Sequence, residues 1–204
     1  MRFGQSYFYK DKQKRISEKS IFVLMFNDFK PVLKVLLRFI LLYVVLVLGY
    51  QFYLNGYKNA GLDPFSTWTM QQADFLQNLF GYPSQMVEGK PQDETTWFYV
   101  SGQYVSRMVE GCNAISVMIL FLAFIFAFYE GLKTFIFAIV GVVFLHIINV
   151  FRIVGLNILI VEIPQYTRFG HDYLFPAIIY GSVVVLLLIW IKFYALKNVK
   201  DENS

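Results

Sequence analysis

The sequence contains little of what a soluble protein or a metalloenzyme needs. Its single cysteine, Cys112, excludes an internal disulfide and any site built from several cysteines. Its two histidines, His146 and His171, leave a zinc site short of ligands. Charged residues make up 16% of the chain, whereas soluble domains carry about a quarter. We therefore expect no soluble globular fold, no metal and no organic cofactor.

Apolar residues take the place of the missing charge and amount to 57% of the 204 residues. A bilayer core about 30 Å thick requires roughly 20 apolar residues in a helix. Four windows without charged residues have about this length, at 39–57, 111–129, 134–151 and 173–191. The first is too long for a signal peptide, and we interpret it as an uncleaved anchor. The predicted fold class is therefore all-α, a polytopic membrane helical bundle with about four transmembrane helices.

The basic residues predict the orientation of this bundle. They are concentrated before the first window, at Lys133 between the second and third, and after the fourth. Lys and Arg are enriched on the cytoplasmic side of membrane proteins, so both termini are expected in the cytoplasm. The net charge of +4 then reflects membrane topology, and nucleic-acid binding is not expected. The predicted organisation has five parts: a basic cytoplasmic segment 1–38, a first span 39–57, an outer-face loop 58–110, a core 111–191 with three spans, and a cytoplasmic tail 192–204.

The outer-face loop contains one clear helix signal. Asp63-Pro64 has the pattern of an N-cap followed by proline at the first helical position, and Gly81 and Pro83 end the run. Between them, large apolar residues recur at helical spacing: Phe65, Trp68, Phe75, Leu76 and Leu79. We expect an amphipathic helix on the outer membrane surface. The aromatic stretch 97–105 that follows is compatible with either a strand or a loop.

Three residues could carry chemistry, and each has a second interpretation. Cys112 lies near the N-terminus of the predicted second span, where the helix dipole favours a nucleophilic thiolate, although cysteine is also a common small packing residue. Arg152 is the one charged residue in the stretch 134–161, and it would either face protein and water or snorkel to the headgroups. The segment 153–163 would then be interfacial, re-entrant or part of a long helix. His171 can exchange protons near neutral pH, or be an ordinary surface residue.

The predicted topology brings these three residues to one level on the outer side. Cys112, Arg152 and His171 belong to three different spans, and the topology was assigned without using them as candidates. A thiol nucleophile, a fixed cation and a proton carrier are the groups required for acyl transfer through a thioester. His146 lies six residues before Arg152, about 240° around a helix. It is therefore expected on another face, buried and hydrogen-bonded.

The motifs around these residues resemble those of a known family. The segments are Val-Glu-Gly-Cys-Asn-Ala-Ile-Ser at 109–116, Asn-Val-Phe-Arg-Ile at 149–153, and Gly-His-Asp at 170–172. In order and placement they resemble the exosortase/archaeosortase family, particularly its short F-type exosortase branch. The resemblance covers about 105–190. It implies a cysteine protease or transpeptidase that cleaves C-terminal sorting signals of membrane-tethered precursor proteins at the outer face of the bacterial cytoplasmic membrane.

The resemblance also implies roles for the candidate residues. Cys112 would be the nucleophile, Arg152 the oxyanion stabiliser or a cation that positions the substrate, and His171 the general acid and base. The expected partners are the precursor proteins and membrane lipid. One departure is that many members follow the cysteine with Ser/Thr-Gly, whereas this chain has Asn113-Ala114. That change could alter the oxyanion site or the recognised motif.

Two non-enzymatic alternatives remain open at this point. The chain could be a scaffold or assembly subunit of a surface-polymer or secretion system, with Cys112 as packing and Arg152 as an interfacial anchor. A small transporter has less support, because four spans with one intramembrane cation offer few polar groups for a solute pathway. The sorting motif, the acceptor of the thioester and the oligomeric state stay undecided.

Overall fold

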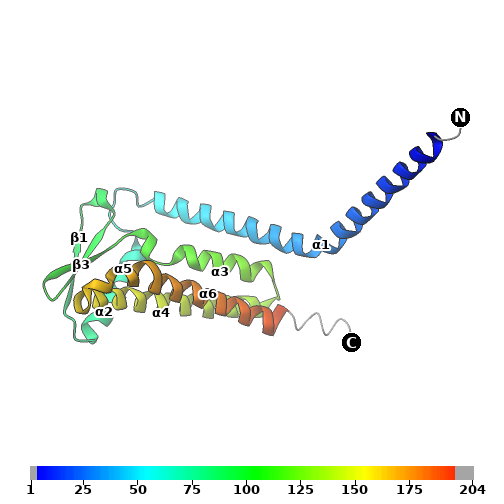
Figure 1. Ribbon diagram of the computed structural model, residues 1–204. Coiled ribbons are helices and arrows are strands. Elements are labelled where there is room, and N and C mark those ends of the chain that lie inside the picture. The colour runs from blue at the N-terminus through cyan, green and yellow to red at the C-terminus, as the bar shows by residue number, and fades with distance from the viewer. Residues whose placement is uncertain (1–3, 196–204) are drawn as a thin grey trace.

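The computed structural model describes the backbone of residues 4–195 and the side chains of residues 29–193. Most of the basic tail expected at 192–204 therefore lies outside the described residues. The chain is mostly helical, and Figure 1 shows its arrangement. The helices are α1 (Gly4–Asn55), α2 (Pro64–Leu79), α3 (Ile115–Ala127), α4 (Leu132–Glu162), α5 (Thr167–Phe169) and α6 (Phe175–Trp190). The strands are β1 (Ser84–Glu88), β2 (Thr96–Val100) and β3 (Gln103–Met108).

Four helices, α1, α3, α4 and α6, lie side by side, so that the chain passes four times between the two ends of the bundle (Figure 1). We call the end that carries β1–β3 the sheet end, and the end formed by the turn 128–131 the loop end. Helices α3, α4 and α6 share an apolar core, which includes Phe121, Leu145, Ile179 and Trp190. Helix α1 packs along α3.

Three helical stretches are long and apolar enough to cross a membrane, namely Phe29–Asn55, Leu132–Glu162 and Pro164–Phe193. The expected helical membrane protein is confirmed at this level. A fourth full-length span is not confirmed, because α3 has 13 residues, or about 20 Å at 1.5 Å per residue. The predicted window 111–129 is longer than α3 because its first residues form a short 3₁₀ turn, Glu110–Cys112, and Ala114 has a left-handed backbone.

Helix α4 resolves the question left open for segment 153–163. It is continuous over 31 residues, about 46 Å long at 1.5 Å per residue, and so exceeds the thickness of a bilayer core of about 30 Å. Arg152 lies inside this helix, ten residues before its last residue, Glu162. Residues 153–162 therefore continue a long helix and form no re-entrant turn.

The amphipathic helix predicted after Asp63 is present as α2. The Asp63 side chain caps it by accepting hydrogen bonds from the backbone N–H groups of Phe65 and Ser66, both at 3.1 Å. Its buried face is formed by small or polar residues and Met70, and it packs on α4. Phe75 and Leu79 are exposed, whereas Trp68 is half exposed and its ring stacks on His146 of α4. A face of this kind suits contact with lipid.

The sheet end contains a three-stranded antiparallel sheet in the order β1-β2-β3. The all-α prediction omitted this sheet, although the aromatic stretch 97–105 was compatible with a strand. Strand β2 alternates buried and half-buried residues, as a strand with one covered face does. Ser101 and Gly102, with φ of 51° and 80°, form the tight turn to β3. Phe98 and Met108 attach the sheet to α2 and α4.

Candidate functional site

A cavity of about 350 Å³ lies at the sheet end, between β3, α4 and the segment that precedes α6. Cys112, Arg152 and His171, the three residues selected from the sequence, all line it. They come from the turn before α3, from α4 and from the turn before α6. The remaining wall is formed by apolar side chains and a few polar ones: Phe98, Ser106, Arg107, Met108, Val109, Ile153, Leu156, Asn157, Ile160 and Thr167.

Cys112 is held in place through its main chain. It ends the short turn Glu110–Cys112, which connects β3 to α3, and its N–H donates to the carbonyl of Val109 at 2.9 Å. Its own carbonyl accepts a hydrogen bond from Asn149 Nδ2 at 3.0 Å. The side chain is half-buried and packs against the apolar cluster of the sheet end. The thiol thus has a fixed position at the cavity wall, while the contacts that fix it do not use the sulfur.

Asn149 connects Arg152 to the cysteine loop. It is completely buried on α4, one turn before Arg152. Its Oδ1 accepts a hydrogen bond from Arg152 Nη1 at 3.2 Å, while its Nδ2 donates to the carbonyl of Cys112. Asn149 belongs to the motif at 149–153, but no role of its own was predicted for it. A polar residue three positions before an arginine in an apolar span is the signal that could have revealed it.

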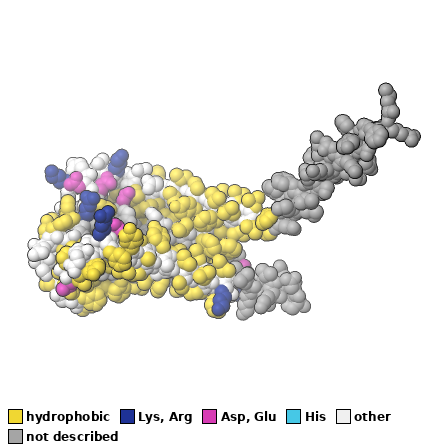
Figure 2. Space-filling model, in the orientation of Figure 1, with side chains coloured by type: hydrophobic (Ala, Val, Ile, Leu, Met, Phe, Trp, Pro, Cys, Tyr) yellow, Lys and Arg dark blue, Asp and Glu magenta, His cyan; other side chains and the backbone are white. Residues whose placement is uncertain are grey.

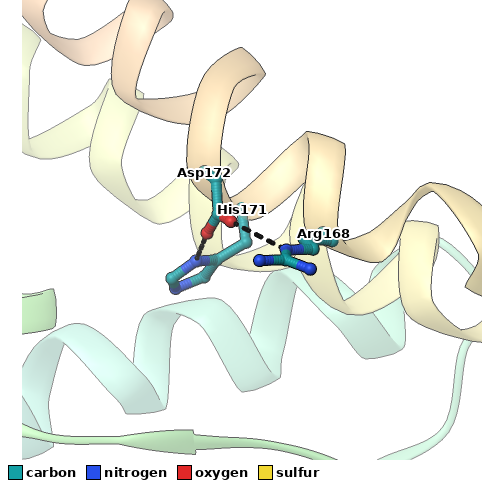
Figure 3. A network of polar contacts seen from close by, with 3 residues as sticks. All are labelled: Arg168, His171 and Asp172. Atoms are coloured by element: carbon teal, nitrogen blue, oxygen red, sulfur yellow. Dashed lines mark hydrogen bonds and ion pairs between the residues drawn. The ribbon is translucent and has the colours of Figure 1, made fainter.

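His171 lies in a π-helical turn, Gly170–Leu174, immediately before α6. Its Nδ1 is 2.8 Å from Asp172 Oδ1, and Arg168 Nε is 3.6 Å from the other oxygen of this carboxylate (Figure 3). The His171 side chain is 59% exposed, so a solute can reach the ring. Because Asp172 engages Nδ1, Nε2 is the nitrogen left for proton exchange. Asp172 and Arg168 were not selected from the sequence as functional residues.

The dipeptide Asn113-Ala114, which follows the cysteine, has a structural role. Asn113 is buried, its Oδ1 accepts from the N–H of Ile115 at 2.9 Å, and its Nδ2 donates to Tyr50 and Ser66. It thereby ties α1 and α2 to the beginning of α3. Ala114 has φ of 60°, a left-handed conformation that glycine adopts at lower cost. The backbone at Ala114 therefore has a shape that favours glycine.

As predicted, His146 is separate from Arg152 and from the cavity that Arg152 lines. Its Nε2 is 3.0 Å from Gln72 Oε1, and its ring stacks on Trp68 with 4.7 Å between centroids. It is half-buried between α4 and α2 and does not line the cavity. The predicted hydrogen bond and the separation from Arg152 are confirmed, but the predicted full burial is wrong, because the ring lies at the partly open contact between α4 and α2.

A second group of polar side chains contributes two residues, Ser106 and Asn157, to the cavity wall. Asn157, buried on α4, accepts a hydrogen bond from Ser106 of β3 at 2.6 Å and donates to Gln77 of α2 at 3.3 Å. These contacts fix the sheet and α2 relative to the cavity. Within residues 29–193 no three His, Cys, Asp or Glu side chains come together as a metal site.

Comparisons of the chain with protein-family models, with curated proteins and with solved structures find no match. The cavity combines a thiol, an imidazole with one nitrogen engaged by a carboxylate, and a guanidinium. These groups suit nucleophilic attack on a carbonyl, followed by protonation of the leaving group.

Proposed function

We propose that this protein is a membrane-embedded cysteine protease or transpeptidase of the exosortase type. It cleaves C-terminal sorting signals of exported precursor proteins at the outer face of the bacterial cytoplasmic membrane. The observation that carries the proposal is the common cavity: Cys112, Arg152 and His171 come from three separate segments of the chain and line one space.

The reaction proceeds through a thioester. The Cys112 thiol transfers its proton to His171, and the sulfur attacks the carbonyl carbon of the scissile peptide bond. Arg152 stabilises the resulting oxyanion or positions the substrate. His171 returns the proton to the leaving amine as the C–N bond breaks, which releases the C-terminal signal. Water or an acceptor amine then attacks the thioester and regenerates the thiol.

The proposed topology places the sheet end outside the cell and both termini in the cytoplasm. In the view of Figure 2, hydrophobic side chains cover the helices, while most charged side chains gather over the sheet end. Helix α3 and its flanking residues provide a fourth crossing in a bundle that the other helices already hold in register. The hydrophobic tail of the precursor would lie in lipid beside the bundle, with the scissile bond at the level of the cavity.

The two histidines provide a matched test of this function. We expect His171→Gln to slow cleavage of a co-expressed tail-anchored precursor by about a hundredfold or more, because glutamine cannot transfer the proton. His146→Gln should cleave at close to the wild-type rate, since His146 lies outside the cavity and glutamine keeps a hydrogen-bonding side chain. Immunoblots would follow the size of the precursor at equal membrane abundance of the variants. Equal cleavage by wild type and His171→Gln would refute a proton-transfer role for His171.

A further inference from the structure

An open groove of about 370 Å³ lies between α2 and α4. Most of its lining is apolar and none of it is charged: Trp68, Gln71, Gln72, Phe75, Leu76 and Val150. Two contacts with His146 of α4 hold the α2 wall in place, namely the stacked ring of Trp68 and the side-chain amide of Gln72. The groove shares no lining residue with the cavity beside Cys112, and the proposed reaction gives it no role.

The groove lies where the hydrocarbon core of a membrane would end. Lys133 and Arg152 are the charged residues of α4 that precede its last residue, Glu162. They are 19 positions apart, which corresponds to about 28 Å along the helix axis and matches the thickness of a bilayer core, about 30 Å. A membrane crossed by α4 therefore has its two boundaries near these cations. Val150, two positions before Arg152, lies just inside the boundary on the side of the sheet end.

From the groove toward the loop end, the surface of α4 is open to lipid. Val143 and Ile139 precede Val150 by seven and eleven positions, or two and three helical turns, so the three residues share one face. The side chains of Val143 and Ile139 are 53% and 66% exposed, so the rest of the described chain does not cover them. The rise from Val150 to Ile139 is about 16 Å, close to half the thickness of the bilayer core. The groove thus continues into an apolar track as long as one leaflet is deep.

The α2 side of the groove offers hydrogen-bond donors at this boundary. Gln71 is exposed and has no hydrogen-bond partner among the described residues. Gln72 uses its Oε1 atom toward His146, which leaves its amide N–H groups for a ligand. The indole of Trp68 has an N–H donor as well, and tryptophan is enriched at membrane interfaces. An α-helix is about 10–12 Å across, so one turn of it already exceeds the volume of the groove. A single acyl chain is much thinner and fits.

We propose that the groove between α2 and α4 binds one phospholipid of the leaflet next to the sheet end. One acyl chain lies on the face of α4 from Val150 to Ile139, and the ester and phosphate oxygens accept hydrogen bonds from Gln71 and Gln72. The groove is continuous with the lipid-facing surface of a membrane-spanning helix, which identifies a lipid as the occupant. The site goes beyond the proposed function, because it requires only that α4 crosses a membrane, in either direction.

Native mass spectrometry of the purified full-length protein can count bound lipids. The protein is delipidated in detergent and titrated with dioleoylphosphatidylcholine, which has no net charge and is not drawn to exposed cations. We expect the first lipid to bind about tenfold more tightly than the following ones. Val143→Trp obstructs the track and should reduce the first affinity to that of the others. Val185→Trp places the same ring at an exposed position of α6 and should leave it unchanged.

A matched pair of glutamines tests the polar contacts. Gln71→Leu should weaken binding of the first lipid about threefold or more, because one hydrogen bond is lost. Gln51→Leu removes an exposed glutamine of α1 outside the groove and should not change this affinity. The readout is the same lipid titration.

Fluorescence quenching locates the bound lipid. Phosphatidylcholine brominated near the ester end of one chain quenches a tryptophan that it contacts. At about one such lipid per protein, the wild type should lose fluorescence and Trp68→Phe should lose little, because Trp97 belongs to the sheet and Trp190 is completely buried. An equimolar polyleucine helix with lysines at both ends, a stand-in for the tail of a precursor, should not restore the signal.

Several results would overturn the inference. They are a first lipid bound no more tightly than the others, equal effects of Val143→Trp and Val185→Trp or of Gln71→Leu and Gln51→Leu, equal quenching of the wild type and Trp68→Phe, and recovery of the signal with the helical peptide. The last result would assign the groove to a protein helix. None of these measurements depends on cleavage, so the lipid site and the proposed function can fail separately.

Discussion

Replacing Cys112 with alanine is expected to reduce precursor cleavage at least about a thousandfold, because the thioester cannot form without the sulfur. The fold should tolerate the change. The two hydrogen bonds of this residue use its main-chain N–H and C=O groups, which alanine retains. The measurement is the rate of cleavage of a co-expressed tail-anchored precursor, followed by immunoblot and compared at equal amounts of protein in the membrane.

Cys112→Ser is the informative companion to this variant. Serine keeps a small hydroxyl nucleophile, but the hydroxyl is far harder to ionise than a thiol, so we expect a loss of similar size. If Cys112→Ala and the wild type cut the same precursor at the same rate, the thiol mechanism is wrong. The scaffold alternative would then explain the protein better, with Cys112 as a packing residue.

Replacing Gly141 with leucine is expected to cause a large loss in the free energy of unfolding. Gly141 is buried on α4 where α3 crosses it, and a Cβ atom at this position would overlap the ring of Phe121. Phe121 is completely buried in the core shared by α3, α4 and α6, so the ring has no free space to move into. Overpacking of a filled core typically costs about 1–3 kcal/mol, and a whole leucine side chain belongs at the upper end of this range or above it.

Gly181 on α6 provides a matched control for this substitution. It is also a glycine in a membrane-spanning stretch, but a Cβ atom there would meet nothing within 4 Å. If Gly141→Leu lowers the free energy of unfolding by about 3 kcal/mol, its unfolding midpoint in detergent should fall by about 6–12 °C. The midpoint of Gly181→Leu should stay within about 2 °C of the wild type. Equal shifts in the two variants would contradict the close approach of α3 and α4 at Gly141.

The parts of the fold that follow from hydrophobic length and from local signals could be predicted from the sequence. Helix α2 begins at Pro64 because Asp63 caps it, and the cap is readable from two adjacent residues. The length of α3 was not readable in this way. Residues 111–114 are apolar or small enough to extend a hydrophobic window, yet they form a turn, because Asn113 bonds to Tyr50 and Ser66 far away in the sequence.

The candidate residues could be selected from chemistry and topology, but the groups that hold them could not. Cys112, Arg152 and His171 stand out because a thiol, a cation and an imidazole are rare in an apolar chain. Asn149 contributes through two contacts, one of them to a main-chain carbonyl 37 residues away, and no local pattern encodes such a pairing. The sheet likewise depends on pairing between strands, which the alternation of a single strand does not specify.

Acylation of Cys112 by the precursor can be tested by trapping the acyl group with hydroxylamine. Purified protein is incubated with the precursor in the presence and absence of hydroxylamine, and the released N-terminal product is analysed by mass spectrometry. Because hydroxylamine attacks thioesters readily, we expect a product that ends in a hydroxamate when hydroxylamine is present. This product should be missing from reactions with Cys112→Ala. A product that ends only in a free carboxylate, at an unchanged rate of cleavage, would contradict a thioester on Cys112.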